Sequence, residues 1–437
     1  MRTHLTILLA MLLCAGAASA RDWYVSVDGT GDGLTSGSPT QDLAAVLNAA
    51  GSGDAIYLNG GDQFGYPANA LTVAVAVTVQ SFGTGQAILS NTTHVANGRL
   101  LTIAAGGSDS VIDNVYFAFM DYGSAASYAT FYLLNNAHRI TLKNSTFQHV
   151  DSPGGNWSGE PFIAMTGVAH TNLAIIGNTF LNLRYEAGLA YRHKIMHLNG
   201  ASDSIVANNV ASNYEGFIVT ASPGSYRLQI VSNTLYQCMA ALQFGGTSTA
   251  GGILQRDYDG ISSGSEVAWN IIYNGPPYAS NVFQTCAFYI PRDDGSGAGS
   301  GFNNVKFHHN TLYEIASVFM WTSTHGSGTG IEVYDNIFVR SYPGGASTGF
   351  WSNVGGISSG TVYSNLWDPF QEFTNENYDV AGVDIAGNPV ADPQFASLDP
   401  SHPLFLRPQN LLAKLGYSGT DVGAKVFFPE PASVMAL

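Results

Sequence analysis

The densest group of basic and imidazole side chains in the sequence lies within the fourteen residues 184–197, which hold three of its sixteen Lys and Arg residues and two of its eleven histidines. A Lys or His side chain can remove a proton as a general base, a Tyr hydroxyl can donate one, and an Arg fork can bind a carboxylate. This group therefore has the residue types for proton transfer on an anionic ligand, although a solvated basic turn beside the core is the simpler alternative. Its members are Arg184, Tyr191, Arg192, His193, Lys194 and His197.

Strand alternation decides which members of this group can act together. If Lys194 begins a strand that runs to Leu198, Lys194 and Met196 lie on one face, and Ile195 and His197 lie on the other. Lys194 and His197 are then not expected to converge. The loop that precedes the strand can still carry the remaining members over the mouth of the strand, where an anionic ligand could be held.

A second candidate is the carboxylate pair Asp293 and Asp294, on a Gly-rich loop that begins at Pro291. Adjacent carboxylates can share one proton, which suits an acid and base pair in hydrolysis, or can hold one Ca²⁺ ion. Asp-Asp-Gly is equally a common turn sequence. The sequence therefore requires no cofactor and leaves the metal requirement open, with Ca²⁺ as the cation that these oxygen ligands would favour.

His308 and His309 are neighbours in the sequence, directly before Asn310. Because neighbouring side chains of a strand point to opposite faces, we expect one imidazole to face the coil and the other to face solvent. Joint binding of a metal ion by the two rings is accordingly not expected.

A repeated phrase indicates which elements must position these side chains. Nine copies of a short apolar segment with a central asparagine follow one another at a mean spacing of about 31 residues, within the range of roughly 20–50 residues that marks stacked structural repeats. One coil of chain per copy is the direct interpretation. The nine asparagines are Asn114, Asn144, Asn178, Asn208, Asn233, Asn270, Asn310, Asn336 and Asn365.

Each copy alternates apolar and polar residues around its asparagine, a pattern typical of a strand that is interrupted by a sharp bend. Asparagine tolerates left-handed backbone geometry, and its amide can hydrogen bond to the equivalent amide of the next coil. One repeat cannot bury its apolar face alone, whereas coils stacked at roughly 4.8 Å form parallel sheets around a continuous core. The sequence thus predicts an all-β fold, a parallel β-helix.

Composition limits the partners of such a fold. The chain of 437 residues has 45% hydrophobic and only 11% charged side chains, which excludes a disordered protein. Its formal net charge is −15, and such a surface repels nucleic acid and anionic membranes. Residues 1–20 have a basic start, an apolar run and small residues at the end, so we expect a secretory leader that is cleaved before Arg21. No later segment reaches the roughly 18 apolar residues of a membrane span.

Both ends of the chain resemble the caps of a known superfamily. The opening combines Trp23-Tyr24-Val25, a Gly-rich turn, the segment from Leu43 to Ala50 and Gly53-Asp54-Ala55-Ile56-Tyr57-Leu58, and the closing stretch contains Ala391-Asp392-Pro393-Gln394-Phe395. With the repeats, these segments resemble the pectate-lyase-like, right-handed parallel β-helix superfamily. The resemblance implies one domain over residues 21–425, a solenoid of about nine to eleven coils with caps at both ends and a short N-terminal capping helix.

The superfamily consists mainly of enzymes that act on acidic or neutral polysaccharides. On this resemblance we expect a secreted or cell-surface polysaccharide lyase, a monomer that cleaves an acidic, uronic-acid-containing polymer by β-elimination and has no nucleic-acid partner. The expected catalytic residues are Lys194, His193, His197, Tyr191 and Arg192, and the expected substrate-binding residues are Arg184 and Arg227. The alternatives are a glycoside hydrolase that uses Asp293 and Asp294, and a non-catalytic surface or matrix protein.

The final segment, Phe428-Pro429-Glu430-Pro431-Ala432-Ser433, resembles the start of the PEP-CTERM surface-sorting tail of Gram-negative bacteria. Such tails continue into a membrane-length apolar helix and a basic cluster, whereas this sequence ends at Leu437. The resemblance assigns residues 426–437 to a tail behind the β-helix domain. A disordered terminus that contains two prolines is the alternative.

Overall fold

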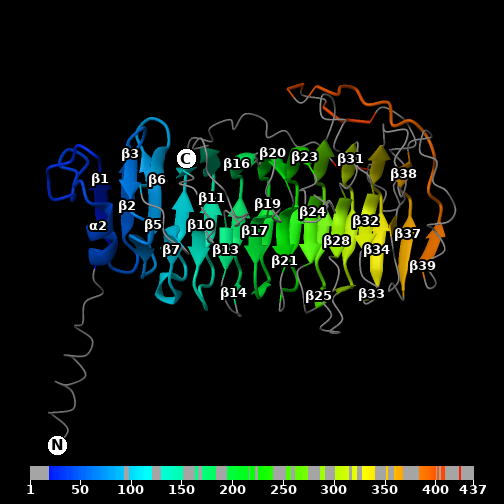
Figure 1. The fold of residues 1–437 in the computed structure, drawn as a ribbon, viewed down its shortest axis with the longest axis horizontal. Helices are drawn as coiled ribbons and strands as arrows, with labels where there is room; N and C mark the ends of the chain where they lie inside the picture. Colours follow the sequence, from blue (N-terminus) through cyan, green and yellow to red (C-terminus); the bar gives the residue numbers. More distant parts are fainter. Residues whose placement is uncertain are drawn as a thin grey trace, which may run out of the picture.

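In the computed structural model, short parallel strands wind into a right-handed solenoid whose coils are stacked along its long axis (Figure 1). The structure describes residues 19–424 apart from 93–97, 121–128, 151–162, 166–169, 184–193, 216, 222–224, 240–251, 257–260, 274–285, 291–300, 314–316, 322–326, 340–350, 353–358, 368–382, 400, 403–404 and 409–422. Within these residues the helical elements are the α-helix α2 (Leu43–Ala49) and the 3-10 helix η1 (Ala105–Gly107). None of the described helices is long and apolar enough to cross a membrane.

Three long parallel sheets form the walls of the solenoid in the described part of the chain. The 13-stranded sheet contains, in spatial order, β1 (Asp22–Val25), β2 (Ala55–Asn59), β5 (Thr78–Phe82), β8 (Val111–Asp113), β11 (Thr141–Lys143), β15 (Ala174–Ile176), β19 (Ile205–Ala207), β22 (Gln229–Val231), β26 (Glu266–Ala268), β30 (Lys306–His308), β34 (Ile331–Tyr334), β37 (Gly360–Tyr363) and β39 (Val383–Ala386). The 11-stranded sheet contains β3 (Gln63–Tyr66), β6 (Ala87–Asn91), β9 (Val115–Met120), β12 (Thr146–Val150), β16 (Thr179–Leu183), β20 (Val210–Glu215), β23 (Thr234–Met239), β27 (Ile271–Tyr273), β31 (Thr311–Tyr313), β35 (Ile337–Val339) and β38 (Leu366–Trp367). The ten-stranded sheet contains β4 (Leu71–Val73), β7 (Arg99–Ile103), β10 (Ala129–Leu133), β13 (Ile163–Met165), β17 (Lys194–Leu198), β21 (Phe217–Ala221), β24 (Gly252–Arg256), β28 (Cys286–Ile290), β32 (Ser317–Trp321) and β36 (Trp351–Ser352).

Two small parallel sheets lie outside these walls. They are formed by β14 (His170–Thr171) with β18 (Ala201–Ser202), and by β25 (Ile261–Ser263), β29 (Gly301–Asn303) and β33 (Ser327–Thr329). In all five sheets the neighbouring strands come from successive coils, as in β11 and β15, where Thr141 pairs with Ala174. This arrangement confirms the predicted parallel β-helix.

A ladder of asparagine side chains runs along the corner between the 13-stranded and the 11-stranded sheet. Asn178 donates from Nδ2 to Oδ1 of Asn209 at 3.1 Å, and the same contact repeats at 2.8–3.0 Å in each following coil. The Nδ2 group of Asn178 also donates to the backbone carbonyl of Leu142 in the preceding coil, at 3.0 Å. The members of the ladder are Asn178, Asn209, Asn233, Asn270, Asn310, Asn336, Asn365 and Asn388.

The predicted ladder is wrong at three of its nine positions. Asn114, Asn144 and Asn208 have left-handed φ angles of 56°, 51° and 55° and stand one residue before the ladder position. In the coil of Asn208 the ladder residue is its neighbour Asn209, and Asn388 extends the ladder by a coil that the repeated phrase did not reveal. Because asparagine suits both the left-handed bend and the ladder, the residue type alone could not distinguish the two positions.

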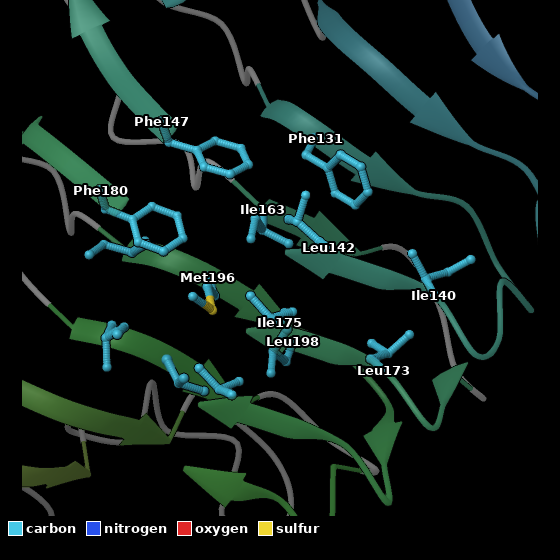
Figure 2. Close-up of a cluster of buried hydrophobic side chains, with 14 of the residues drawn as sticks. Phe131, Ile140, Leu142, Phe147, Ile163, Leu173, Ile175, Phe180, Met196 and Leu198 are labelled. Carbon is cyan, nitrogen blue, oxygen red and sulfur yellow. The ribbon is translucent and has the colours of Figure 1, made fainter. Parts of the chain in front are cut away.

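Aligned apolar side chains fill the inside of the solenoid (Figure 2). The rings of Phe117, Phe147 and Phe180 stack from one coil to the next, with centroids 4.7 Å and 5.0 Å apart. Phe131, from the ten-stranded sheet, meets Phe117 edge-on at 6.2 Å. These stacks follow from the parallel register, because equivalent residues of successive coils lie directly above one another.

The N-terminal end of the core is covered by α2, as predicted. The Asp42 carboxylate caps this helix by accepting a hydrogen bond from the backbone N–H of Ala45 at 3.0 Å. Leu43, Val46 and Leu47 are buried on the side of α2 that faces the core. Such a cap hides apolar side chains and unpaired strand edges that a bare solenoid end would expose.

The C-terminal part of the described chain, orange to red in Figure 1, turns back along the outside of the 11-stranded sheet. Phe405 is buried against Ile271, and its ring meets the ring of Tyr273 edge-on at 5.0 Å. Ala424 donates its backbone N–H to Oγ1 of Thr311 at 3.0 Å. The expected tail at 426–437 and most of the expected leader lie outside the described residues.

Candidate functional site

The strand predicted to carry catalytic residues is present as β17, in the middle of the ten-stranded sheet. Met196 and Leu198 point into the core and are fully buried (Figure 2), whereas His197 lies on the outer side and is partly exposed. This confirms the predicted alternation. Ile195 shares the outer side with His197 and is nevertheless buried, so part of this face is covered. The backbone of Lys194 begins the strand, as predicted.

The strand register brings His197 into a row that crosses the outer face of the ten-stranded sheet. Its partner in β13 is Ala164, whose own partner in β10 is Tyr132, and on the other side its partner in β21 is Thr220. Two strand spacings, about 10 Å, therefore separate His197 from Tyr132. Both rings are partly exposed.

Arg99 adds a positive charge to this row. Its guanidinium carbon lies 3.5 Å from the centroid of the Tyr132 ring, a cation–π contact. A guanidinium whose face rests on a ring can still use its N–H groups to bind a carboxylate in two-pronged fashion. No neighbouring motif marks Arg99 in the sequence, so it was not among the predicted site residues. The scarcity of Lys and Arg in the chain was the only available signal.

Most of the other predicted site residues lie outside the described part of the chain. These are Arg184, Tyr191, Arg192, His193, Asp293 and Asp294. Their roles stay predictions, as does a Ca²⁺ site at the carboxylate pair. Among the residues that the structure does describe, no three His, Cys, Asp or Glu side chains form a metal-binding group.

Arg227, the second residue predicted to bind substrate, lies at the corner between the ten-stranded and the 13-stranded sheet. Its guanidinium forms a two-pronged ion pair with Asp203 of the preceding coil and rests over the ring of Tyr226, 4.5 Å from its centroid. The hydrogen bonds of this pair lower the pKa of Asp203 and raise the pKa of Arg227. Because both side chains are exposed, the pair contributes little stability. The substrate-binding role of Arg227 stays a prediction.

The structure contradicts the expected orientation of His308 and His309. Both side chains are buried, with exposed fractions of 5% and 4%, and their Nδ1 atoms lie 2.8 Å apart. The cause is the backbone of His309, whose φ of 54° is left-handed. This conformation breaks the strand alternation and turns the second ring back toward the first. The two histidines therefore meet on the side of β30 opposite the core residue Phe307.

Two carboxylates from neighbouring coils approach the outer nitrogens of this histidine pair. Oε1 of Glu266 lies 2.9 Å from Nε2 of His308. Oδ2 of Asp335, a fully buried side chain, lies 3.8 Å from Nε2 of His309. The four side chains form a continuous polar array in which the imidazoles contact each other and each imidazole faces one carboxylate.

Two aromatic rings hold the imidazoles in this orientation. Tyr334 stacks on His308 with centroids 4.7 Å apart and an interplanar angle of 8°, and Trp269 stacks on His309 at 5.4 Å and 28°. Burial lowers the pKa of His308, and the opposing effect of Glu266 does not compensate for it. His308 is consequently neutral at neutral pH, with the proton on Nε2 directed at the Glu266 carboxylate.

Comparisons with known proteins bear on the fold. No protein-family model matches the chain, and no curated protein matches it either. Among solved structures, the GH136 lacto-N-biosidase of Eubacterium ramulus is similar with a TM-score of 0.52 and 13% identity, over 85% of this chain and 68% of that one. The pectate lyase Pel9A is similar with a TM-score of 0.51 and 13% identity, over 94% of this chain and 97% of that one.

These similarities establish the architecture. The chain has the pectin-lyase-like, right-handed parallel β-helix fold that the resemblance implied, and it extends over almost the whole length of the pectate lyase. Unrelated chemistries occur on one fold, so the reaction has to be argued from the side chains.

Proposed function

We propose that this chain is an exported, carbohydrate-active β-helix protein that cleaves a uronic-acid-containing polysaccharide by β-elimination at the outer face of its ten-stranded sheet. One observation carries the proposal. His197 and Tyr132 lie in one row on this face, and the guanidinium of Arg99 rests on the Tyr132 ring. The similarity to a pectate lyase supports the type of reaction.

The reaction needs three kinds of group, and this row offers each of them. A cation must neutralise the uronate carboxylate, which acidifies the C5–H bond, and Arg99 is suited to that contact. A base then removes the C5 proton, the C4–O bond breaks and a C4=C5 double bond forms. In this row His197 is the candidate base, and Tyr132 can return a proton to the leaving oxygen. Lys194 begins the same strand on the other face by alternation and stays the second predicted base.

The charge of the protein makes a local basic patch necessary. At a formal net charge of −15 the molecule repels a polyuronate, and exposed charges further away than a Debye length of about 8 Å are largely screened at physiological salt. Arg99 and the predicted basic segment 192–194, which leads directly into β17, would supply positive charge at one place. Binding should therefore depend on a few residues and weaken as salt is added.

A second candidate function is glycoside hydrolysis by Asp293 and Asp294. The similarity to a lacto-N-biosidase favours it, because the match is as good as the match to the pectate lyase. A carboxylate pair would serve as general acid and base or nucleophile. The third alternative, a non-catalytic surface or matrix protein, predicts that no product forms.

One experiment separates these functions. The protein is incubated with alginate, pectate, glycosaminoglycans and neutral glycans while absorbance near 235 nm and reducing ends are both followed, because elimination alone creates a conjugated double bond absorbing at about that wavelength. We expect both signals to rise together on a polyuronate. Reducing ends without absorbance would assign hydrolysis, and neither signal on any glycan would favour the non-catalytic alternative.

A further inference from the structure

We infer that His308 and His309 form a binding site for a divalent transition-metal ion, with their two Nδ1 atoms as the protein ligands. The inference is independent of the proposed polysaccharide chemistry. It starts from the contact between the two buried rings, whose Nδ1 atoms lie 2.8 Å apart at an interplanar angle of 84°. Adjacent residues of a regular strand could not form such a contact, and the left-handed backbone of His309 makes it possible.

The distance between the two nitrogens indicates the geometry of the ion. Metal–imidazole bonds of about 2.0–2.1 Å put two ligand nitrogens about 2.9 Å apart at a right angle and about 3.3 Å apart at a tetrahedral angle. The observed 2.8 Å fits the right angle. Tetragonal coordination of this kind is preferred by Cu²⁺ and Ni²⁺, whereas Zn²⁺ prefers a tetrahedron.

One carboxylate stands where a metal-binding histidine needs it, and a second lies just beyond hydrogen-bond distance of the other ring. A histidine that ligates a metal through one ring nitrogen almost always donates its other N–H to a carboxylate, carbonyl or water, which fixes the ring and raises its basicity. Here Glu266 lies 2.9 Å from Nε2 of His308, and Asp335 lies 3.8 Å from Nε2 of His309. Each ring therefore has its Nδ1 beside the Nδ1 of the other ring and its Nε2 toward a carboxylate.

Proton and charge counts agree with an ion at this point. When the two Nδ1 atoms contact each other directly, one of them must carry a proton and the other must accept it with its lone pair. A metal ion instead binds the lone pairs of both Nδ1 atoms, and both Nε2 atoms then carry their protons on the carboxylate side. Glu266 and Asp335 bring two acidic side chains to the cluster, and a divalent ion would supply positive charge between them. The nearby cation Lys306 is engaged with Glu332, 3.8 Å away.

The site is rigid and lies next to a partly exposed side chain. Tyr334 and Trp269 stack on the two rings from neighbouring coils, so little side-chain entropy is lost on binding. Because the described residues contain no third His, Cys, Asp or Glu ligand in metal-binding geometry, water or an oxygen atom of a bound molecule would complete the coordination. One third of the Glu266 side chain is exposed, which connects the cluster to solvent.

Titration of the full chain with Cu²⁺ after treatment with a chelator tests the inference. Calorimetry should find one tight site, and electron paramagnetic resonance should show hyperfine coupling to imidazole nitrogen. His308→Gln or His309→Gln should lower the affinity at least about 100-fold, and Glu266→Gln should lower it about 10–100-fold, the usual effect of losing the partner of a ligating histidine. The control His138→Gln, at a partly exposed histidine of another corner, should bind as the wild type does.

Cooperative thermal unfolding of each variant shows that it is folded before its affinity is compared. If His308→Gln does not fold, His309→Gln and Glu266→Gln decide the question, the latter because its partly exposed position tolerates an amide. The inference would be overturned if the wild-type protein showed no nitrogen-coordinated Cu²⁺. It would also be overturned if the His309→Gln and Glu266→Gln variants folded and bound Cu²⁺ with wild-type affinity.

Discussion

At the scale of single residues, Asp54 ties the N-terminal strand to the first coil. Its carboxylate accepts hydrogen bonds of 2.9 Å from Nε1 of Trp23 and from the backbone N–H groups of Arg21 and Gly51. Burial alone would raise the pKa of Asp54, but the three hydrogen bonds outweigh burial and hold the pKa below its ordinary value of 3.8. The charged form is therefore the one that stabilises the fold.

This lowered pKa predicts how stability depends on pH. The contribution of Asp54 is complete above the unfolded-state pKa and is lost as the pH falls through the lower folded-state pKa. We expect Asp54→Asn to reduce the free energy of unfolding by about 1.5–3 kcal/mol at about pH 6 and by less at about pH 3. Denaturant titrations at both pH values measure this, with the exposed Asp28→Asn as control. An equal cost at both pH values would contradict the role of the charge.

The residues proposed for elimination make separate kinetic predictions. Loss of the true base, tested with His197→Ala and Lys194→Ala, should lower kcat by about 10²–10⁴-fold. Arg99→Ala should mainly raise KM and reduce the salt dependence of binding, because it removes a cation that holds the carboxylate. Arg139→Ala, at an exposed ion pair on a corner, is the control and should change neither constant. Full elimination activity in all three test variants would move the active site away from this face.

Local rules explain which of these residues could be predicted. Alternation along one strand is enough to put Met196 in the core and His197 outside. The same rule failed at His308 and His309, because the residue before the ladder asparagine is left-handed in coil after coil, with φ of 55° at Trp269 and 53° at Asp335. Alternation restarts at that position, and where it is His309 no glycine signals the bend, as Gly177 does before Asn178.

At the scale of elements, the asparagine ladder joins each coil to the next at one corner. Asn178 accepts the backbone N–H of Ser145 at 3.0 Å on one side and donates to Asn209 on the other, so its side chain satisfies buried groups of three coils. Loss of the amide leaves buried donors and acceptors without partners, which is more costly than the net value of one hydrogen bond.

We expect Asn178→Leu to destabilise the protein by about 1–3 kcal/mol, since leucine resembles asparagine in size but offers no polar atoms. Thermal or denaturant unfolding measures the change. Asn135→Leu, at an exposed asparagine of a turn, is the matched control and should stay within about 0.5 kcal/mol of the wild type. Unchanged stability of Asn178→Leu would mean that the ladder does not bear on the energy of the fold.

Two of the three strands in each coil could be read from the repeated phrase, and the third could not. The apolar residues on either side of Asn178 form β15 and β16, and the other copies behave alike. Strands of the ten-stranded sheet share no such phrase. Successive ladder asparagines are 23 to 40 residues apart in the sequence. The strands of the ten-stranded sheet therefore begin at no fixed number of residues from a ladder asparagine. Only β17 was predicted there, from its own alternation.

At the scale of the whole molecule, each coil contacts only its neighbours, and the terminal coils lack one. The first strands of the three walls, β1, β3 and β4, would therefore be open edges that another chain could extend. The helix α2 lies at this end of the solenoid (Figure 1), with its apolar side against the core. Solubility of the molecule should then depend on one short helix.

Leu47→Asp tests this dependence. Leu47 is 4% exposed under α2, and a carboxylate at that position cannot stay charged without pulling the helix from the core. We expect lower thermal stability and, by size-exclusion chromatography with light scattering, larger species formed through the uncovered end. Asn48→Asp adds the same charge to the exposed side of the same helix and should elute as the wild type does. A destabilised Leu47→Asp variant of unchanged size would show that the edges at this end are protected without α2.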